Sequence, residues 1–139
     1  WCAYAGADLA GTSRFEYPPN IRIVRVMCSG RVDRDFILHA FKKGAGMVLV
    51  GACHPYDCHY IDGNLKMKVR MDALAKALEK MGLTPDRFRV EYISAAEGVK
   101  FAQIVREMSA KLKEIGRERI IAENEKIRPY LERMLSRKG

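Results

Sequence analysis

Four cysteines are the residues of this chain whose types and positions could do chemistry. Cys53 and Cys58 lie five positions apart, directly after the strongly apolar run Met47–Val50. Cys2 and Cys28 fall at the ends of other segments that could converge on the same place. Thiolates are the ligands that zinc and iron–sulfur clusters use. We therefore take all four cysteines as candidate metal ligands.

The spacing of these cysteines favours an iron–sulfur cluster over zinc. Zinc ribbons use two cysteine pairs with about two to four residues inside each pair, and only Cys53 and Cys58 are that close here. Glycines stand near the cysteines at Gly6, Gly30 and Gly51. Glycine leaves room beside inorganic sulfide, and its N–H group can hydrogen-bond to cluster sulfur. Zinc stays the alternative.

Two histidines flank the close cysteine pair. His54 and His59 could ligate iron in a mixed site, which would raise its reduction potential. They could instead hydrogen-bond to cluster sulfur or cap the loop, and with four thiols in the chain we favour this role. His39 lies inside a helical pattern, and we expect it to be packed in the core.

Composition indicates a folded chain in a reducing compartment. Apolar residues make up 48% of the 139 residues, which excludes a disordered chain. Four cysteines are too few for a small secreted disulfide scaffold, so we expect a cytoplasmic protein without structural disulfides. The net charge of +8 admits nucleic acid, an acidic protein face or an anionic cofactor as partner. We expect neither a membrane span nor a signal peptide.

The elements that must position the cysteines alternate between strand and helix. This order predicts an α/β fold with an open, mainly parallel sheet of three to four strands, flanked by helices in a Rossmann- or flavodoxin-like way. A fourth strand would precede Trp1. We expect one α/β domain over 1–116 and a charged helical extension over 117–139. The predicted strands are 21–27, 47–50 and 88–93, and the predicted helices are 33–43, 65–81 and 94–115.

This topology suggests how the cysteines meet. Sites in an open parallel sheet form outside the carboxyl ends of the strands. Cys28 directly follows the first predicted strand and Cys53 directly follows the second. Cys58 lies in the same loop as Cys53, and Cys2 would follow the strand upstream of Trp1. The sequence therefore predicts that separate segments deliver four thiols to one edge of the sheet.

Several stretches together resemble a known family, the delta subunit of methyl-viologen-reducing hydrogenase. The resemblance extends over 1–116 and is carried by residues 2–11, 17–20, 25–31, 51–60 and 93–101. It implies a 2Fe–2S cluster in an electron-transfer subunit without catalytic residues of its own. It also implies electron relay between a hydrogenase or formate dehydrogenase and the flavin-containing subunit of heterodisulfide reductase, in the electron bifurcation of methanogenic archaea.

One departure from the family leaves the ligand set open. The family usually has a Cys-x-Trp-Cys pair, and Trp1-Cys2 resembles its second half. If the first cysteine of that pair belongs to the intact protein, five cysteines compete for four positions, and Cys2 or Cys28 could be the one left out. The role of the 117–139 extension also stays open between a partner-binding helix and a solvated surface helix.

The main alternative function is a zinc-stabilised interaction or nucleic-acid-binding module. Basic residues on the predicted helix 65–81 could contact phosphates. However, the chain lacks the interleaved aromatic residues of single-strand binders, so we expect no nucleic-acid partner. A flavin- or nucleotide-binding domain is disfavoured because no Gly-x-Gly-x-x-Gly follows a predicted strand.

Overall fold

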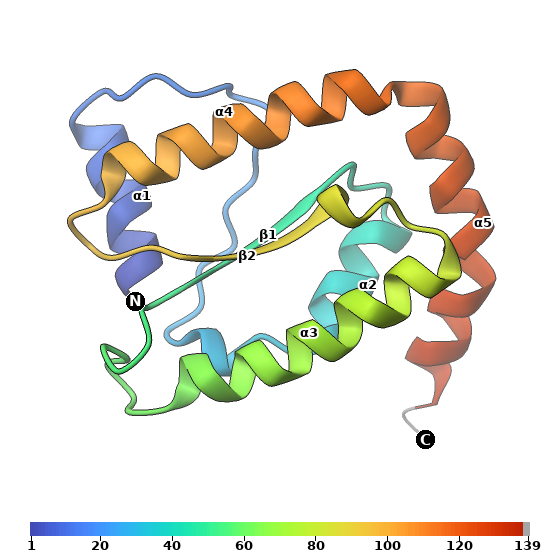
Figure 1. The fold of residues 1–139 in the computed structure, drawn as a ribbon, viewed down its shortest axis with the longest axis horizontal. Helices are drawn as coiled ribbons and strands as arrows, with labels where there is room; N and C mark the ends of the chain where they lie inside the picture. The colour runs from blue at the N-terminus through green and yellow to red at the C-terminus, as the bar shows by residue number, and fades with distance from the viewer. Residues whose placement is uncertain (138–139) are drawn as a thin grey trace.

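The computed structural model describes residues 1–137, in which two parallel strands lie among five helices (Figure 1). Strands β1 (Val48–Ala52) and β2 (Phe88–Tyr92) pair with Val50 opposite Val90. Short 3-10 turns occur at η1 (Ser29–Arg31) and η2 (Pro85–Arg87). The helices are α1 (Cys2–Thr12), α2 (Arg34–Lys42), α3 (Gly63–Met81), α4 (Gly98–Ile115) and α5 (Arg117–Ser136).

Local sequence signals set the bounds of several helices. The Asp33 side chain accepts a hydrogen bond from the backbone N–H of Arg34 at 2.6 Å, which caps α2. Gly82 ends α3 with a φ of 104°, a left-handed conformation that glycine adopts without steric cost. The Glu97 carboxylate accepts from the backbone N–H of Ser94, just before α4 begins at Gly98.

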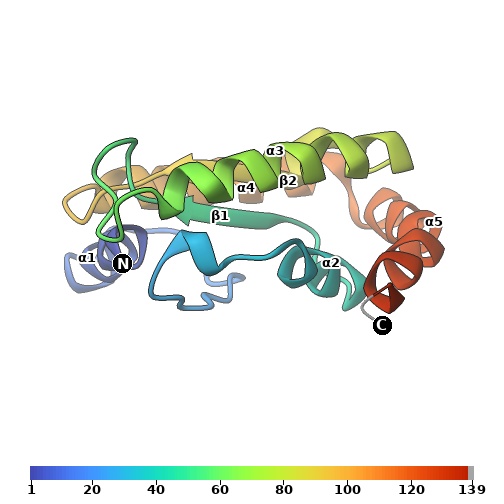
Figure 2. The same ribbon diagram turned by 90° about the horizontal axis from the view of Figure 1, so that it is seen from below.

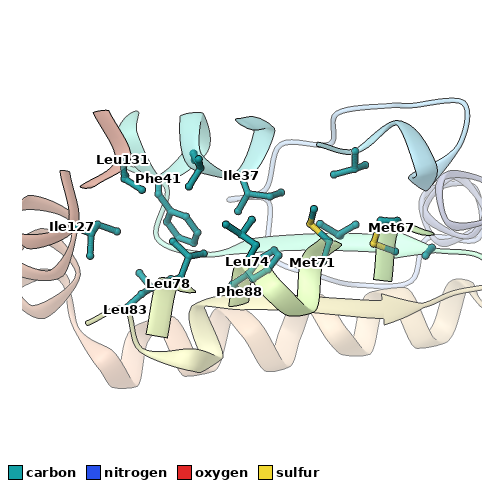
Figure 3. Close-up of a cluster of buried hydrophobic side chains, with 14 residues drawn as sticks. Ile37, Phe41, Met67, Met71, Leu74, Leu78, Leu83, Phe88, Ile127 and Leu131 are labelled. Carbon is teal, nitrogen blue, oxygen red and sulfur yellow. The ribbon is translucent and has the colours of Figure 1, made fainter. Parts of the chain in front are cut away.

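Two clusters of buried apolar side chains cover the two faces of the sheet. Successive strand residues point to opposite faces, so Val50 belongs to the first cluster while Leu49 packs against the second. The first cluster joins α2, α3 and α5 (Figure 3), and the second joins α1 and α4. The labelled side chains of the first cluster are Ile37, Phe41, Met67, Met71, Leu74, Leu78, Leu83, Phe88, Ile127 and Leu131.

Helix α5 packs into the first cluster. Its Ile127 and Leu131 are fully buried and lie beside side chains of α2 and α3 (Figure 3). The fully buried Arg87 of η2 donates to the Glu123 carboxylate of α5 at 2.8 Å. The expected division of the chain at Gly116 stays a prediction, and its last two residues lie outside the described part.

The prediction of a strand over 21–27 is wrong. This segment has no regular secondary structure, and its Val24 is 81% exposed. Its β-branched residues favour a strand, but that preference is realised only where a ladder partner and a burying surface exist. The described sheet therefore has two parallel strands instead of the expected three to four, although the α/β class is confirmed.

The segments that carry the cysteines gather at one end of the molecule. The N-terminus, the loop after β1 and the start of α3 lie together at this end, and α5 lies at the other (Figures 1 and 2). We call this end the thiol pole, made of residues 1–4, 28–31 and 53–65. Among the residues that the structure describes, no helix has the length and apolarity needed to cross a bilayer.

Candidate metal centre

Cys53 lies at the carboxyl end of β1, as the sequence predicts. Its side chain is buried, directly after the last strand residue, Ala52. The buried Asn64 of α3 holds the chain here, because its side-chain N–H groups donate to the carbonyls of Cys53 at 3.0 Å and His54 at 2.8 Å. The start of α3 is thereby fixed against the end of the strand.

Cys28 and Cys58 form a close pair of thiols. Their Sγ atoms are 3.9 Å apart, and both side chains are part-buried. Cys28 was expected to follow a strand, but it precedes η1 instead, and the backbone N–H of Gly30 donates to its Sγ at 3.3 Å. Cys28 therefore reaches the thiol pole because η1 packs against α3, and not because it follows a strand.

Cys2 is the first residue of α1 and contacts Cys53. Burial raises the pKa of the Cys2 thiol, and a hydrogen bond with Cys53 raises it further. Small residues allow α1 to come this close to the sheet, since a Cβ on Gly51 would lie 2.9 Å from the Cβ of Ala3. The Cys2–Cys53 contact thus depends on tight packing between α1 and β1.

Electrostatics at the pole favour negative charge on Cys58. Burial opposes it, yet the backbone N–H groups of Asn64 and Tyr60, followed by Cys28 and the N–H of Gly63, hold the pKa of the Cys58 thiol below its usual value. Gly63 and Asn64 begin α3, and a helix N-terminus stabilises a thiolate. For Cys28, burial is the largest effect and its pKa is raised.

Gly63 lets the start of α3 lie directly against the thiols, where a side chain would collide with them. A Cβ at this position would lie 2.5 Å from the Sγ of Cys28 and 3.6 Å from that of Cys58. A Cβ on Gly30 would lie 3.0 Å from the Cα of Gly63. The buried Ser29 hydroxyl has no hydrogen-bond partner among the described residues. Together these features fit a sulfur-rich group bound between the cysteines.

The four thiols lie as two neighbouring pairs. Cys28 pairs with Cys58, and Cys2 pairs with Cys53, while charge interactions link Cys2 to Cys58 and Cys28 to Cys53. Within residues 1–137, no three His, Cys, Asp or Glu side chains gather closely enough to hold a metal ion. Cysteine thiolates are the usual ligands of iron–sulfur clusters.

The histidines have other partners in the structure. The Nε2 of His54 donates to the Glu97 carboxylate, and this hydrogen bond is the largest cause that lowers the pKa of Glu97 to about 2. The His59 ring lies 4.9 Å from the Trp1 ring. His39 is exposed on α2, so its expected place in the core is wrong, because it faces away from the buried side of that helix.

Comparison with known protein families finds one that matches most of this chain. The family described as FlpD, methyl-viologen-reducing hydrogenase, delta subunit, matches residues 1–116. The chain belongs to this family. Its four cysteines all fall inside the matched residues, whereas α5 lies outside them. The resemblance drawn from the sequence is confirmed.

Two curated relatives match this delta-subunit chain over most of their length. The iron-sulfur subunit of the F420-non-reducing hydrogenase of Archaeoglobus profundus is 47% identical over 116 residues, which are 84% of this chain and 85% of that protein. The vhc iron-sulfur subunit of the F420-non-reducing hydrogenase of Methanococcus voltae is 50% identical over 116 residues, with 84% of this chain and 81% of that protein covered.

A third relative is a much longer protein. It is a subunit of the ferredoxin/F(420)H(2)-dependent CoB-CoM heterodisulfide reductase of Methanosarcina acetivorans, and it is 51% identical over 116 residues. The match takes in 84% of this delta-subunit chain but only 15% of that protein. The region shared with this chain therefore also occurs as one part of a longer heterodisulfide reductase polypeptide, which we call the long reductase subunit.

Sequence reasoning missed three residues of the centre in this delta-subunit chain. Gly63 and Asn64 precede the predicted helix 65–81, yet they begin α3 and support the thiols. Glu97 lies inside the predicted helix 94–115, and its carboxylate holds His54. Gly63 was a usable signal, because glycine permits close approach of the backbone to another group.

Proposed function

We propose that this chain is an electron-transfer subunit that holds a 2Fe–2S cluster through Cys2, Cys28, Cys53 and Cys58. It relays electrons between a hydrogenase or formate dehydrogenase and the flavin-containing subunit of a heterodisulfide reductase. The observation that carries the proposal is the meeting of two thiol pairs at one pole, with Cys28 and Cys58 3.9 Å apart. A bound cluster would supply reversible one-electron exchange.

The residues beside the thiols support a negatively charged, sulfur-rich group. The N–H of Gly30 already donates to the Cys28 sulfur. The N–H groups of Tyr60, Gly63 and Asn64 donate to Cys58. Hydrogen bonds to cluster sulfur stabilise the reduced form and raise its potential. The Ser29 hydroxyl, which has no hydrogen-bond partner within residues 1–137, is a further donor close in the chain.

The names of the relatives support the partners. Several are iron–sulfur subunits of F420-non-reducing hydrogenases, and two are subunits of CoB-CoM heterodisulfide reductases. A protein that passes electrons from one such enzyme to the other would fit both groups of names. Occurrence of the same region inside the long reductase subunit supports a direct contact with the reductase.

The proposal is tested on anaerobically purified protein. We expect about two irons and two acid-labile sulfides per chain, with an EPR signal after dithionite reduction. Replacing any one of the four cysteines with serine should lower the iron content and change the EPR signal. Ser109→Ala, a buried change on α4 away from the thiol pole, is the matched control and should keep both.

Two results would contradict the proposal. Wild-type protein without iron or sulfide would remove its basis. Colourless protein loaded with zinc that binds nucleic acid in a salt-dependent way would support the zinc module instead. Loss of the cluster in only some cysteine variants would correct the ligand set and leave the electron-transfer role standing.

A further inference from the structure

Two bulky residues of the thiol pole have an unfavourable backbone and exposed side chains. Tyr56 has a φ of 68° and is 92% exposed, and Ile61 has a φ of 72° and is 86% exposed. A β-branched residue at positive φ is a genuine outlier. No burial of either side chain offsets this cost in the chain by itself. Such outliers concentrate at functional sites.

Exposed apolar residues continue from Ile61 into the start of α3. Leu65 and Val69 lie four residues apart on one face of α3, and they are 38% and 73% exposed. Ile61 lies in the loop before this helix, directly after Tyr60, which is 48% exposed. We call Tyr56, Tyr60, Ile61, Leu65 and Val69 the apolar crown.

A basic hollow lies between η1 and α3. It has a volume of about 240 Å³ and is lined by Gly30, Arg31, Asp33 and Arg70, which carry two positive charges and one negative charge. Arg70 follows Val69 directly, and its Nη2 donates to the carbonyl of Gly30 at 2.6 Å. Arginines held in this way offer their remaining N–H groups to an incoming carboxylate.

We propose that the apolar crown and this basic hollow are the docking face for an acidic surface of the flavin-containing heterodisulfide reductase subunit. The crown would supply the buried centre of the interface, and the hollow would receive a carboxylate of the partner at its edge. Because the chain has a net charge of +8 and the hollow contains two arginines, the partner surface that fits it is negatively charged.

The location of this face fits its role. Tyr60 and Ile61 lie within three residues of Cys58, and Gly30 hydrogen-bonds to Cys28, so a partner seated here would lie against the thiols. The inference rests on the proposed function, because it names the surface through which that function is carried out.

The test measures binding of the cluster-loaded chain to the purified flavin-containing reductase subunit from the same organism by anaerobic calorimetry. Val69→Glu should weaken binding about tenfold or more, since it places a negative charge against an acidic surface. Val69→Lys, which loses the same apolar contact but adds a positive charge, should weaken it less. Val99→Glu is the matched control, because Val99 is 59% exposed on α4, and it should bind as wild type does.

A fourth variant separates docking from folding. Ile61→Asn should raise the thermal midpoint of the isolated chain, because asparagine tolerates positive φ, and it should weaken binding because the apolar side chain is lost. Binding of the wild type should also weaken with added salt. If Ile61 is retained for partner binding, the Ile61→Asn variant should be more stable than the wild type and should bind the partner more weakly.

The outcomes are distinguishable from failure of the proposed function. Equal affinities for the Val69 variants and Val99→Glu, in protein that keeps its EPR signal, would overturn the docking face and leave the electron-transfer role intact. Equal weakening by glutamate and lysine at Val69 would overturn the acidic nature of the partner surface. Wild-type protein without iron and sulfide would overturn both inferences.

Discussion

Gly63 controls how closely any group can approach the Cys28–Cys58 pair. It is the first residue of α3, and its missing side chain leaves room for the helix backbone to lie beside both sulfurs. Its N–H also donates to Cys58. At the scale of single residues, the candidate metal centre therefore depends on a residue outside the proposed ligand set, because groups next to ligands usually affect how well a metal is held.

Gly63→Ala tests this dependence. The added Cβ would lie 2.5 Å from the Cys28 sulfur, so the thiol must move, and we expect retention of the cluster to fall by about tenfold or more. Iron and acid-labile sulfide per chain provide the measurement. Gly11→Ala is the control, because no atom lies within 4 Å of its added Cβ. Full iron content in Gly63→Ala would contradict the role of this space.

Helix α1 positions Cys2 through its small residues. A Cβ on Gly6 would lie 2.7 Å from the carbonyl oxygen of Ser94, at the end of the sheet, and one on Gly98 would lie 2.9 Å from the backbone nitrogen of Ala10. These close approaches let the helix lie directly against β1 and α4. At the scale of elements, the Cys2–Cys53 contact is a result of helix packing.

Gly6→Ala should destabilise the fold although alanine favours helices. Alanine in place of a helical glycine normally stabilises by about 0.5–1 kcal/mol, and Gly11→Ala should show this gain. At Gly6 the collision with backbone should instead cost about 1–3 kcal/mol and separate Cys2 from Cys53. Urea unfolding of the two variants, with their iron content, measures both effects. A gain in stability at Gly6 would contradict the packing argument.

A buried ion pair far from the thiols holds α5 against the rest of the molecule. Arg87 is fully buried and donates to Glu123, to Asn124 at 2.6 Å and to the carbonyl of Gly46 at 2.7 Å. Burial raises the pKa of Glu123, but hydrogen bonds from Thr84 and Arg87 outweigh it and lower that pKa to about 2. This network joins α5, which lies outside the family match, to the sheet.

Glu123→Gln should therefore lower stability in a pH-dependent way. A carboxylate whose pKa falls on folding stabilises the protein above its unfolded pKa, here 4.5, and loses this contribution as the pH falls towards 2. We expect a loss of about 1.5–3 kcal/mol at neutral pH, the value of a hydrogen bond to a charged group. Urea unfolding between pH 7 and pH 2 is the measurement.

The difference between wild type and Glu123→Gln should close as the pH falls from 4.5 towards 2. The Glu125 side chain is exposed on the same helix, so Glu125→Gln is the control and should track the wild type at every pH. A constant difference across this range would show that Glu123 acts through packing alone.

The sequence by itself determined the family, most helices and the strand that directly precedes Cys53. These follow from local patterns: apolar periodicity, the Asp33 cap, the Gly82 stop and motif stretches that need no tertiary information. It also indicated that the thiols converge, because strand ends are a general place for sites.

Only the tertiary structure decided whether 21–27 forms a strand and how the thiols pair. A β-branched segment becomes a strand only when a neighbouring strand offers a ladder, and none does so here among the described residues. Cys28 reaches Cys58 because Gly30 and Gly63 allow two backbones to touch. Contacts between segments distant in sequence depend on packing, and no local pattern in either segment encodes them.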